Sequence, residues 1–195
     1  MDQLRQLGLH KGWIYEVVIS TYSPDGPHAT PIGVWTHDLA TLQMDLYGGS
    51  RTLANILTRR EFVADMPVDA QVMYTALHAP HALRFGRARE VDAPCLLGSS
   101  ATLELTLIDT SRRTDRVRVT GRVTRVAAHG RPRLINRAEG LLVESLILVS
   151  RLERLDRAAT FAALEENRCV VHRVAPGSEY AQAMDDLLKD LHAGS

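Results

Sequence analysis

The sequence predicts an α+β fold, mainly antiparallel β, that continues into a helical C-terminal subdomain. Two observations predict this class. The first two thirds of the chain contain short segments in which apolar and polar residues alternate, separated by turn residues, as in half-buried strands. The last third repeats its apolar residues at helical spacing. We therefore expect a β-rich domain over residues 1–130 and a helical subdomain over residues 131–195.

Composition excludes several classes of protein. The chain has 195 residues, of which 45% are hydrophobic, and 23 basic residues balance 23 acidic ones. A neutral chain has no overall field that would attract nucleic acid or an anionic membrane. No stretch has the roughly 20 apolar residues of a membrane helix, and the start lacks a secretory pattern, so we expect a cytoplasmic protein. Cys95 and Cys169 stand apart, which favours reduced, buried thiols over a disulfide or a zinc site.

The first half of the β-rich domain is predicted to contain three consecutive antiparallel strands. Residues 13–21 alternate, and the turn Ser23-Pro24-Asp25-Gly26 leads to a β-favouring segment at residues 32–36, which predicts a hairpin. Residues 41–47 alternate again and predict a third antiparallel strand. After it, Ser50 is placed to cap a short helix.

The rest of the chain is assigned in the same way. The predicted elements are a strand at 61–66, a helix at 69–77, a segment ambiguous between strand and loop at 84–91, a second hairpin that turns at 111–114, and helices at 137–155, 158–167 and 179–192. Ser178 is placed to cap the last helix. The apolar stripe from Leu141 to Leu155 is expected to pack on the barrel of the same chain, with a subunit interface as the alternative.

The segment from Gly48 to Asn55 carries the most chemical information. Glycines allow backbone N–H groups to approach an anion, a helix N-terminus adds partial positive charge, and Ser50 and Thr52 supply hydroxyl donors. Arg51 adds a permanent charge and a planar fork that suits phosphate oxygens. These residues predict a phosphate site. The alternative is a plain helix cap beside a solvated arginine, and neither the Walker spacing nor a GxGxxG motif is present.

The longer pattern around this segment resembles a known family. The runs Ile14 to Thr21, Ala29 to Trp35 and Tyr47 to Leu57 are similar to the uncharacterised FMN-binding split β-barrel flavoproteins of methanogenic archaea and methylotrophic bacteria, the DUF447 type. This family is related to flavin reductases and pyridoxamine-phosphate oxidases. Asn136 to Glu139 and Val143 to Ile147 resemble the family's C-terminal domain.

The resemblance implies a cofactor, a site and an assembly. FMN is the implied cofactor, with its phosphate and ribityl chain bound by Ser50, Arg51, Thr52 and Asn55. The ring would be lined, mainly through backbone groups and apolar contact, by Thr30, Pro31, Ile32, Gly33 and Val34. The flavin would lie near the interface of a homodimer, and the redox partner would be a small molecule.

Other motifs give no competing site. Pro80 disfavours the helical turn that would let His78 and His81 bind one metal ion. A basic patch on the second hairpin suits the solvated face of a strand, with a phosphorylated substrate or acidic partner as the alternative; it comprises Arg112, Arg113, Arg116, Arg118 and Arg122. No hydrolase triad or HExxH motif is found, and no catalytic side chain is assigned.

The function expected is therefore that of an FMN-dependent oxidoreductase or flavin reductase, in which the flavin performs the redox step. Two alternatives remain open. One is a non-catalytic FMN carrier, because no substrate pocket or proton donor is evident. The other is an accessory role in tetrahydromethanopterin-linked one-carbon metabolism, which rests on where the resembling proteins occur.

Overall fold

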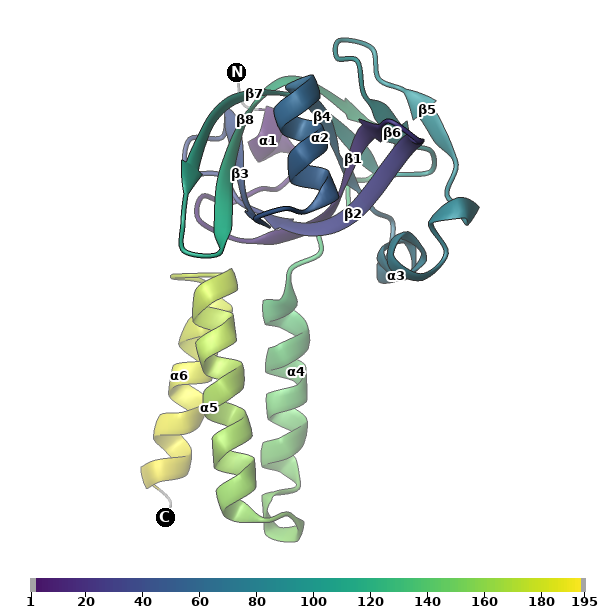
Figure 1. The fold of residues 1–195 in the computed structure, drawn as a ribbon. Coiled ribbons are helices and arrows are strands. Elements are labelled where there is room, and N and C mark those ends of the chain that lie inside the picture. The colour runs from purple at the N-terminus through teal and green to yellow at the C-terminus, as the bar shows by residue number, and fades with distance from the viewer. Residues whose placement is uncertain (1–2, 194–195) are drawn as a thin grey trace. The chain divides into compact units, whose positions relative to one another are not determined.

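The computed structural model describes residues 3–193, and the chain forms two compact units. One unit comprises the residues up to Lys11 together with Tyr15–Ile135, and the other comprises Gly12–Ile14 and the chain from Asn136 onward. The first unit holds the strands and the second holds three long helices (Figure 1). The predicted class, α+β with mainly antiparallel strands and C-terminal helices, is confirmed.

A six-stranded antiparallel sheet forms the body of the first unit. Its strand order is β2-β1-β4-β7-β8-β3. The strands are β1 (Tyr15–Ser23), β2 (Gly26–Val34), β3 (Thr41–Tyr47), β4 (Glu61–Met66), β7 (Ala101–Arg112) and β8 (Arg116–Ala128). The first hairpin is tighter than predicted. The strand expected at 32–36 instead begins at Gly26, because Gly26 adopts φ +116° and pairs directly with Ser23.

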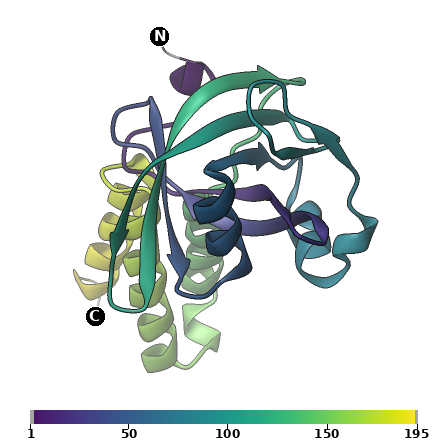
Figure 2. The same ribbon diagram turned by 45° about the horizontal axis from the view of Figure 1, so that its top comes forward.

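The sheet is curled rather than flat, and its curvature has two local causes. β7 and β8 change register between Glu104 and Leu105 and again between Leu107 and Asp109, and such bulges bend a strand pair. Gly121 of β8 lies against Phe62 of β4, where a Cβ atom would come within 2.5 Å of the ring. Helix α2 (Arg51–Arg59) packs against β1 to β4, and Figures 1 and 2 show the sheet curled about this helix.

Smaller elements complete the first unit. They are α1 (Gln3–Gln6), α3 (Ala70–His78), the 3₁₀ turn η1 (Pro80–Ala82) and a two-stranded sheet of β5 (Phe85–Arg87) and β6 (Pro94–Leu96). The helix predicted at 69–77 is confirmed as α3, and the Asp69 carboxylate caps it by accepting from the N–H groups of Gln71 and Val72. The ambiguous segment at 84–91 contains the short strand β5.

Two carboxylates are buried within the sheet unit. Asp65 of β4 accepts from the Ser20 hydroxyl at 2.7 Å and from the Leu96 N–H at 3.0 Å, which ties β6 to the main sheet. Burial raises the pKa of Asp65 to about 7, and the hydrogen bonds from Ser20, Leu96 and Thr102 oppose that rise. Glu104 of β7 accepts the backbone N–H groups of residues 89–91, which fixes the loop between β5 and β6. Both side chains therefore hold chain segments that have little regular structure.

The second unit is built from α4 (Arg137–Ser150), the 3₁₀ turn η2 (Leu152–Arg154), α5 (Arg157–Val174) and α6 (Glu179–Ala193). The helix predicted over 137–155 ends at Ser150, because Asp156 begins a new helix by capping the N–H of Ala159. The core of this unit contains Ala138, Val171, Val174, Ala175, Ala181 and Met184, with Trp13 packed against it. Leu141 and Leu142 of the apolar stripe, which was expected to pack on the barrel, pack against this core. Cys169, which was expected to be buried, is exposed on α5. The predicted Ser178 cap is confirmed by its bond with the Ala181 N–H.

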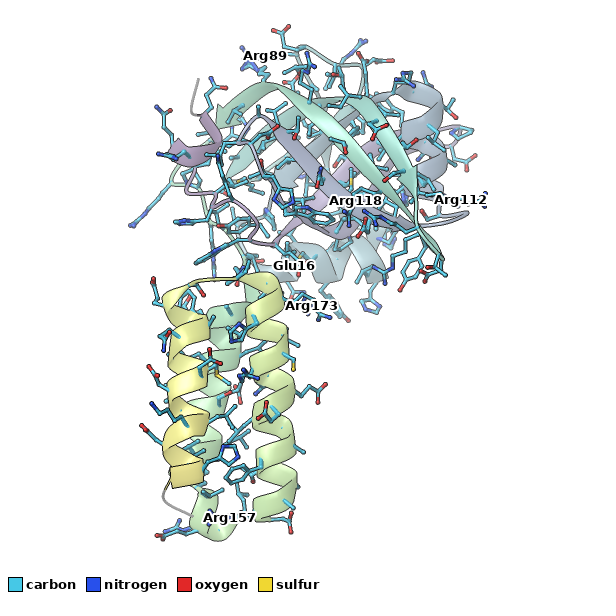
Figure 3. All side chains as sticks on the ribbon, turned by 90° about the vertical axis from the view of Figure 1, so that its left-hand side faces the viewer. Glu16, Arg89, Arg112, Arg118, Arg157 and Arg173 are labelled. Carbon is cyan, nitrogen blue, oxygen red and sulfur yellow. The ribbon has the colours of Figure 1, made fainter. Side chains whose placement is uncertain are left out.

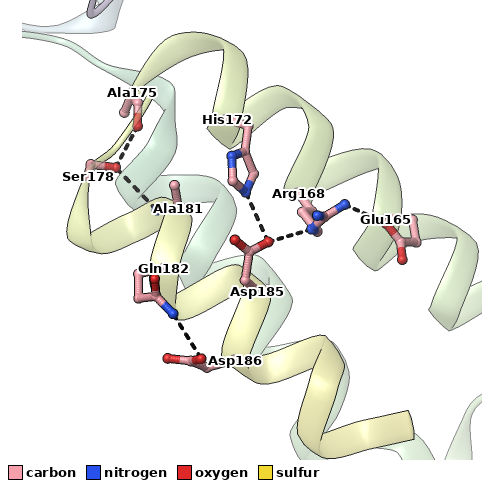
Figure 4. Close-up of polar contacts among 9 residues, drawn as sticks. All are labelled: Glu165, Arg168, His172, Ala175, Ser178, Ala181, Gln182, Asp185 and Asp186. Carbon is pink, nitrogen blue, oxygen red and sulfur yellow. Dashed lines mark hydrogen bonds and ion pairs between the residues drawn. The ribbon is translucent and has the colours of Figure 1, made fainter.

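Polar contacts also join α5 to α6 within this unit. Asp185 of α6 accepts from Arg168 Nε at 2.6 Å and lies 3.0 Å from His172 Nε2, as Figure 4 shows. The hydrogen bond from Arg168 is the largest cause that lowers the pKa of Asp185. These groups are partly exposed, so the cluster orients the two helices without contributing much stability. Among residues 3–193, no helix combines the length and apolarity needed to cross a membrane.

Candidate functional site

The turn that joins β3 to α2 shapes the start of the candidate site. Gly49 adopts φ +80°, a conformation that glycine reaches without strain. The N–H of Ser50 donates to the Tyr47 carbonyl, and the N–H of Gly48 donates to the Asp115 carbonyl in the β7–β8 turn, both at 3.1 Å. These two hydrogen bonds hold the backbone on either side of Gly49 to the end of β3 and to the β7–β8 turn. The positive φ in this turn thus falls on a glycine.

Helix α2 begins at this turn. Ser50 has extended backbone angles, and its hydroxyl accepts from the Leu53 N–H at 3.4 Å, as expected for an N-cap. The helix buries Thr52, Leu53, Asn55 and Ile56 and exposes Arg51. An N-terminus with free N–H groups and an exposed cation is suited to an anion.

Arg51 is uncommitted to other side chains. Within residues 3–193 its guanidinium has no hydrogen-bond or ion-pair partner, whereas Arg118 pairs with Asp45 and Arg168 pairs with Asp185. Its five N–H donors are therefore available to a ligand. A bidentate arrangement with two phosphate oxygens is the geometry that this side chain forms best.

Thr52 connects the helix to the edge strand β2. Its hydroxyl donates to Thr30 Oγ1 at 3.1 Å, and both hydroxyls lie within hydrogen-bond distance of His28 Nε2, at 3.1 Å from Thr52 and 2.9 Å from Thr30. Thr52 is 3% exposed, while His28 and Thr30 are half-buried. The predicted phosphate segment and the predicted ring segment thus meet at this pair of threonines.

His28 was not among the residues that the sequence predicted for the site. Burial, and secondly the charge of Arg51, lower the pKa of its imidazole below the usual value. The only sequence signal that pointed to it is its spacing, since residues 28 and 30 of one strand face the same side of a sheet. This spacing alone does not indicate a site, because the sequence does not show that α2 covers this side of β2.

Asn55 is placed differently from the other predicted phosphate residues. It is 6% exposed, and its Nδ2 donates to the Thr21 hydroxyl of β1 at 3.0 Å. It also borders a hollow of about 540 Å³ that Tyr22 and Arg59 help to line. Its amide therefore holds α2 on β1, and its carbonyl oxygen remains available.

The five predicted ring residues do not share one face of β2. Thr30, Ile32 and Val34 pair with Ile19, Val17 and Tyr15, whereas Pro31 and Gly33 pair with Val18 and Glu16 on the other side of the pleat. The Val34 side chain is buried in the core. Because β2 is the end strand of the sheet order and its backbone groups point alternately toward β1 and away from it, only alternate residues of these five present backbone groups at the outer edge.

The β7–β8 hairpin places further cations beside the turn. Arg116 donates to the Tyr47 hydroxyl at 2.7 Å and lies 4.3 Å from the centre of that ring. Arg118 pairs with Asp45 at 2.9 Å and lies near Trp35, and Arg112 is exposed at the hairpin tip (Figure 3). Two arginines of the basic patch, Arg116 and Arg118, thus already contact Tyr47 and Asp45 of β3 and the ring of Trp35.

The chain was compared with known proteins. The family model described as "Protein of unknown function (DUF447) N-terminal domain" matches residues 15–130. No curated protein sequence matches the chain. The crystal structure of an FMN-bound protein of family DUF447 from Methanosarcina mazei is similar, with a TM-score of 0.56 and 18% identity over 96% of this chain and 98% of that one.

Two further solved structures resemble a smaller part of the chain. The styrene monooxygenase flavin reductase of Pseudomonas putida S12 gives a TM-score of 0.51 at 19% identity, over 62% of this chain and 85% of that one. An FMN-binding protein of Thermus thermophilus with bound p-hydroxybenzaldehyde gives 0.51 at 17% identity, over 59% and 71%. Likeness at these identities shows the fold alone, and it confirms the predicted split-barrel fold.

Proposed function

Since this chain belongs to the DUF447 family, whose N-terminal domain model covers residues 15–130, we propose that its sheet unit binds FMN. In this proposal the phosphate lies at the N-terminus of α2 and the ring lies along the outer edge of β2. The similar protein of Methanosarcina mazei is FMN-bound in its crystal structure, and two other similar proteins are a flavin reductase and an FMN-binding protein.

The observation that carries the proposal is the donor set at the start of α2. Arg51 has no protein partner within residues 3–193, Ser50 caps the helix, and Thr52 is the second residue of its first turn. A phosphate needs several N–H and O–H donors and positive charge, and these residues supply both. The donor chemistry therefore fits a phosphate ester.

Each predicted residue has a role that follows from its place. Arg51 neutralises the phosphate, while Ser50 and Thr52 donate hydroxyl hydrogen bonds, and Asn55 offers its carbonyl oxygen to the ribityl hydroxyls. Alternate residues of the segment from Thr30 to Val34 offer backbone groups of an edge strand to the polar rim of the ring. Bound FMN would supply hydride or electron transfer, and the chain would supply binding, orientation and electrostatics.

We further propose that the protein is an oxidoreductase or flavin reductase that acts on a small molecule, and that it forms a homodimer with the flavin near the subunit interface. The position of β2 at the end of the sheet order supports the second point, because a ring along its outer edge would be open on one side and a second subunit would cover it. Reduction of bound FMN by NADH or NADPH, with turnover on an added acceptor, tests the activity. Reduction without turnover would favour the carrier alternative, and sedimentation tests the dimer.

The cofactor proposal is tested by spectra and by a matched pair of variants. Protein purified from cells should show a flavin spectrum and should bind added FMN. Arg51→Ala should weaken FMN binding by about ten- to hundredfold, because a charge-assisted hydrogen-bond pair is lost, and should leave riboflavin binding unchanged. Arg59→Ala is the control, since Arg59 lies at the other end of the same helix and pairs with Asp92. Equal FMN affinity in both variants would reject the assigned phosphate position.

A further inference from the structure

His28, Thr30 and Thr52 form a closed triangle of hydrogen-bonding atoms. The three distances are 2.9 Å between His28 Nε2 and Thr30 Oγ1, 3.1 Å between His28 Nε2 and Thr52 Oγ1, and 3.1 Å between the two hydroxyl oxygens. Two threonines bring two hydroxyl hydrogens to this triangle. A neutral imidazole brings either one hydrogen on Nε2 or none, depending on its tautomer.

The direction of these hydrogen bonds decides whether Thr52 has a hydroxyl hydrogen left to donate to an anion. As the structure stands, Thr52 donates to Thr30, and Thr30 can then donate to an accepting His28 Nε2. Both hydroxyl hydrogens are used in this arrangement, so Thr52 has none for a phosphate oxygen. Thr52 is almost fully buried, so water is poorly placed to take over the role of either partner.

We propose that His28 is a positioning residue of the anion site, and that anion binding reverses this chain and takes up one proton from solvent. In the bound state Nε2–H of His28 donates to Thr30, Thr30 donates to Thr52, and Thr52 donates to the anion. The proton bonds to the imidazole and makes it an imidazolium, and no other bond changes. The inference rests on the proposed FMN site.

The charges around His28 favour this direction. Burial and the Arg51 charge keep the pKa of the free imidazole low, and a phosphate on Arg51 would offset that charge and favour the imidazolium. Four elements pack against β2, and Arg51 is the charged group among them that shifts the pKa of His28. Their titratable or charged side chains are Tyr15, Glu16 and Tyr22 of β1, Asp45 and Tyr47 of β3, Arg51 and Arg59 of α2, and Tyr74 and His78 of α3.

The test compares the wild type with His28→Gln from pH 6 to pH 8.5. A glutamine amide can donate or accept at the same place, but it cannot take up a proton. FMN itself titrates in this range, since the second pKa of a phosphate ester is about 6, and the ratio of the two dissociation constants cancels that contribution. We expect the wild type to gain affinity relative to His28→Gln by about tenfold as the pH falls, which corresponds to a shift of one pKa unit. Riboflavin should show no such gain.

A second measurement uses only the wild type, in case the variant fails to fold. Calorimetry at pH 7 in two buffers of different ionisation enthalpy should report net proton uptake on FMN binding. Binding of the FMN dianion alone would release protons, so the sign separates the two contributions. A constant affinity ratio, or proton release in the wild type, would overturn the role of His28 and leave the FMN site intact. Failure of the wild type to bind FMN would reject the proposed function together with this inference.

Discussion

The hydroxyl of Thr52 in α2 donates a hydrogen bond of 3.1 Å to the hydroxyl of Thr30 in β2, across 22 residues of sequence. This contact joins the two segments that the sequence assigns to the phosphate and to the ring of one ligand. It also fixes the first turn of α2 against the edge of the sheet. In the proposed site, the Thr52–Thr30 contact therefore connects ligand binding directly to the fold.

Removing either hydroxyl should weaken FMN binding. We expect Thr52→Val to weaken it by about tenfold, the worth of roughly one hydrogen bond, and Thr30→Val to weaken it less. The double variant should lose less binding free energy than the two single variants lose together, because the two hydroxyls act through one chain of hydrogen bonds. Fluorescence titration of FMN measures all four proteins. Thr58→Val is the control, since among residues 3–193 the Thr58 hydroxyl donates to the Ala54 carbonyl in the same helix and to no other group. Full additivity of the two single losses would contradict the coupling.

Asp65 should make the sheet unit less stable as the pH rises. Its pKa is about 7 in the folded state and near 3.8 when unfolded, so the folded chain binds more protons between these values. The stabilisation is complete below about pH 4 and is lost as the pH passes 7, at most roughly 4 kcal/mol. Asp65→Asn should remove this dependence, because an amide can accept from Ser20 and Leu96 and donate to Thr102. Urea unfolding at pH 5 and pH 8 measures the change in the free energy of unfolding.

The matched control for Asp65 is Asp109→Asn, an exposed aspartate on β7. This variant should keep the wild-type dependence on pH. If Asp65→Asn retained the full loss of stability between pH 5 and pH 8, Asp65 would not be its source.

Gly121 should tolerate no larger residue. An added Cβ would lie 2.5 Å from Phe62 Cζ and 3.1 Å from Leu105 Cδ2, and both side chains are fully buried and closely packed. Gly121→Ala should therefore lower the free energy of unfolding by about 1–3 kcal/mol. Gly140→Ala in α4 is the contrasting control, because nothing lies within 4 Å of its Cβ and alanine favours a helix by about 1 kcal/mol. An unchanged free energy of unfolding in Gly121→Ala would show that Phe62 can move.

Glu104 should stabilise the loop between β5 and β6 through its charge. Its carboxylate is 2% exposed, accepts the N–H of Glu90 at 2.6 Å, and forms an ion pair with Arg125 at 3.3 Å. Glu104→Gln keeps the shape but points an NH₂ group at N–H donors and leaves Arg125 without its partner. We expect a loss of about 2–3 kcal/mol and faster proteolysis within residues 88–93. Glu90→Gln, which changes an exposed side chain in the same loop, should behave like the wild type.

The sequence by itself determined the elements whose burial follows a local period. Alternation located β1, β3 and the β7–β8 hairpin, and the Ser50 cap located α2, because a strand or helix repeats its buried face at a fixed spacing. The same local chemistry predicted Ser50, Arg51 and Thr52 as donors to an anion, and this stays a prediction. It placed β2 too late and extended α4 too far, because turns and caps depend on one or two residues whose backbone angles are set by neighbours.

Only the tertiary structure decided which of these segments meet. The order β2-β1-β4-β7-β8-β3 brings His28 and Thr30 beneath α2, and it places Asp115 against Gly48. It also buries Asp65 beneath β6, where its pKa rises. The physical reason is that periodicity reports which side of an element is buried, whereas the partner on that side is chosen by packing and hydrogen bonding between residues far apart in the chain.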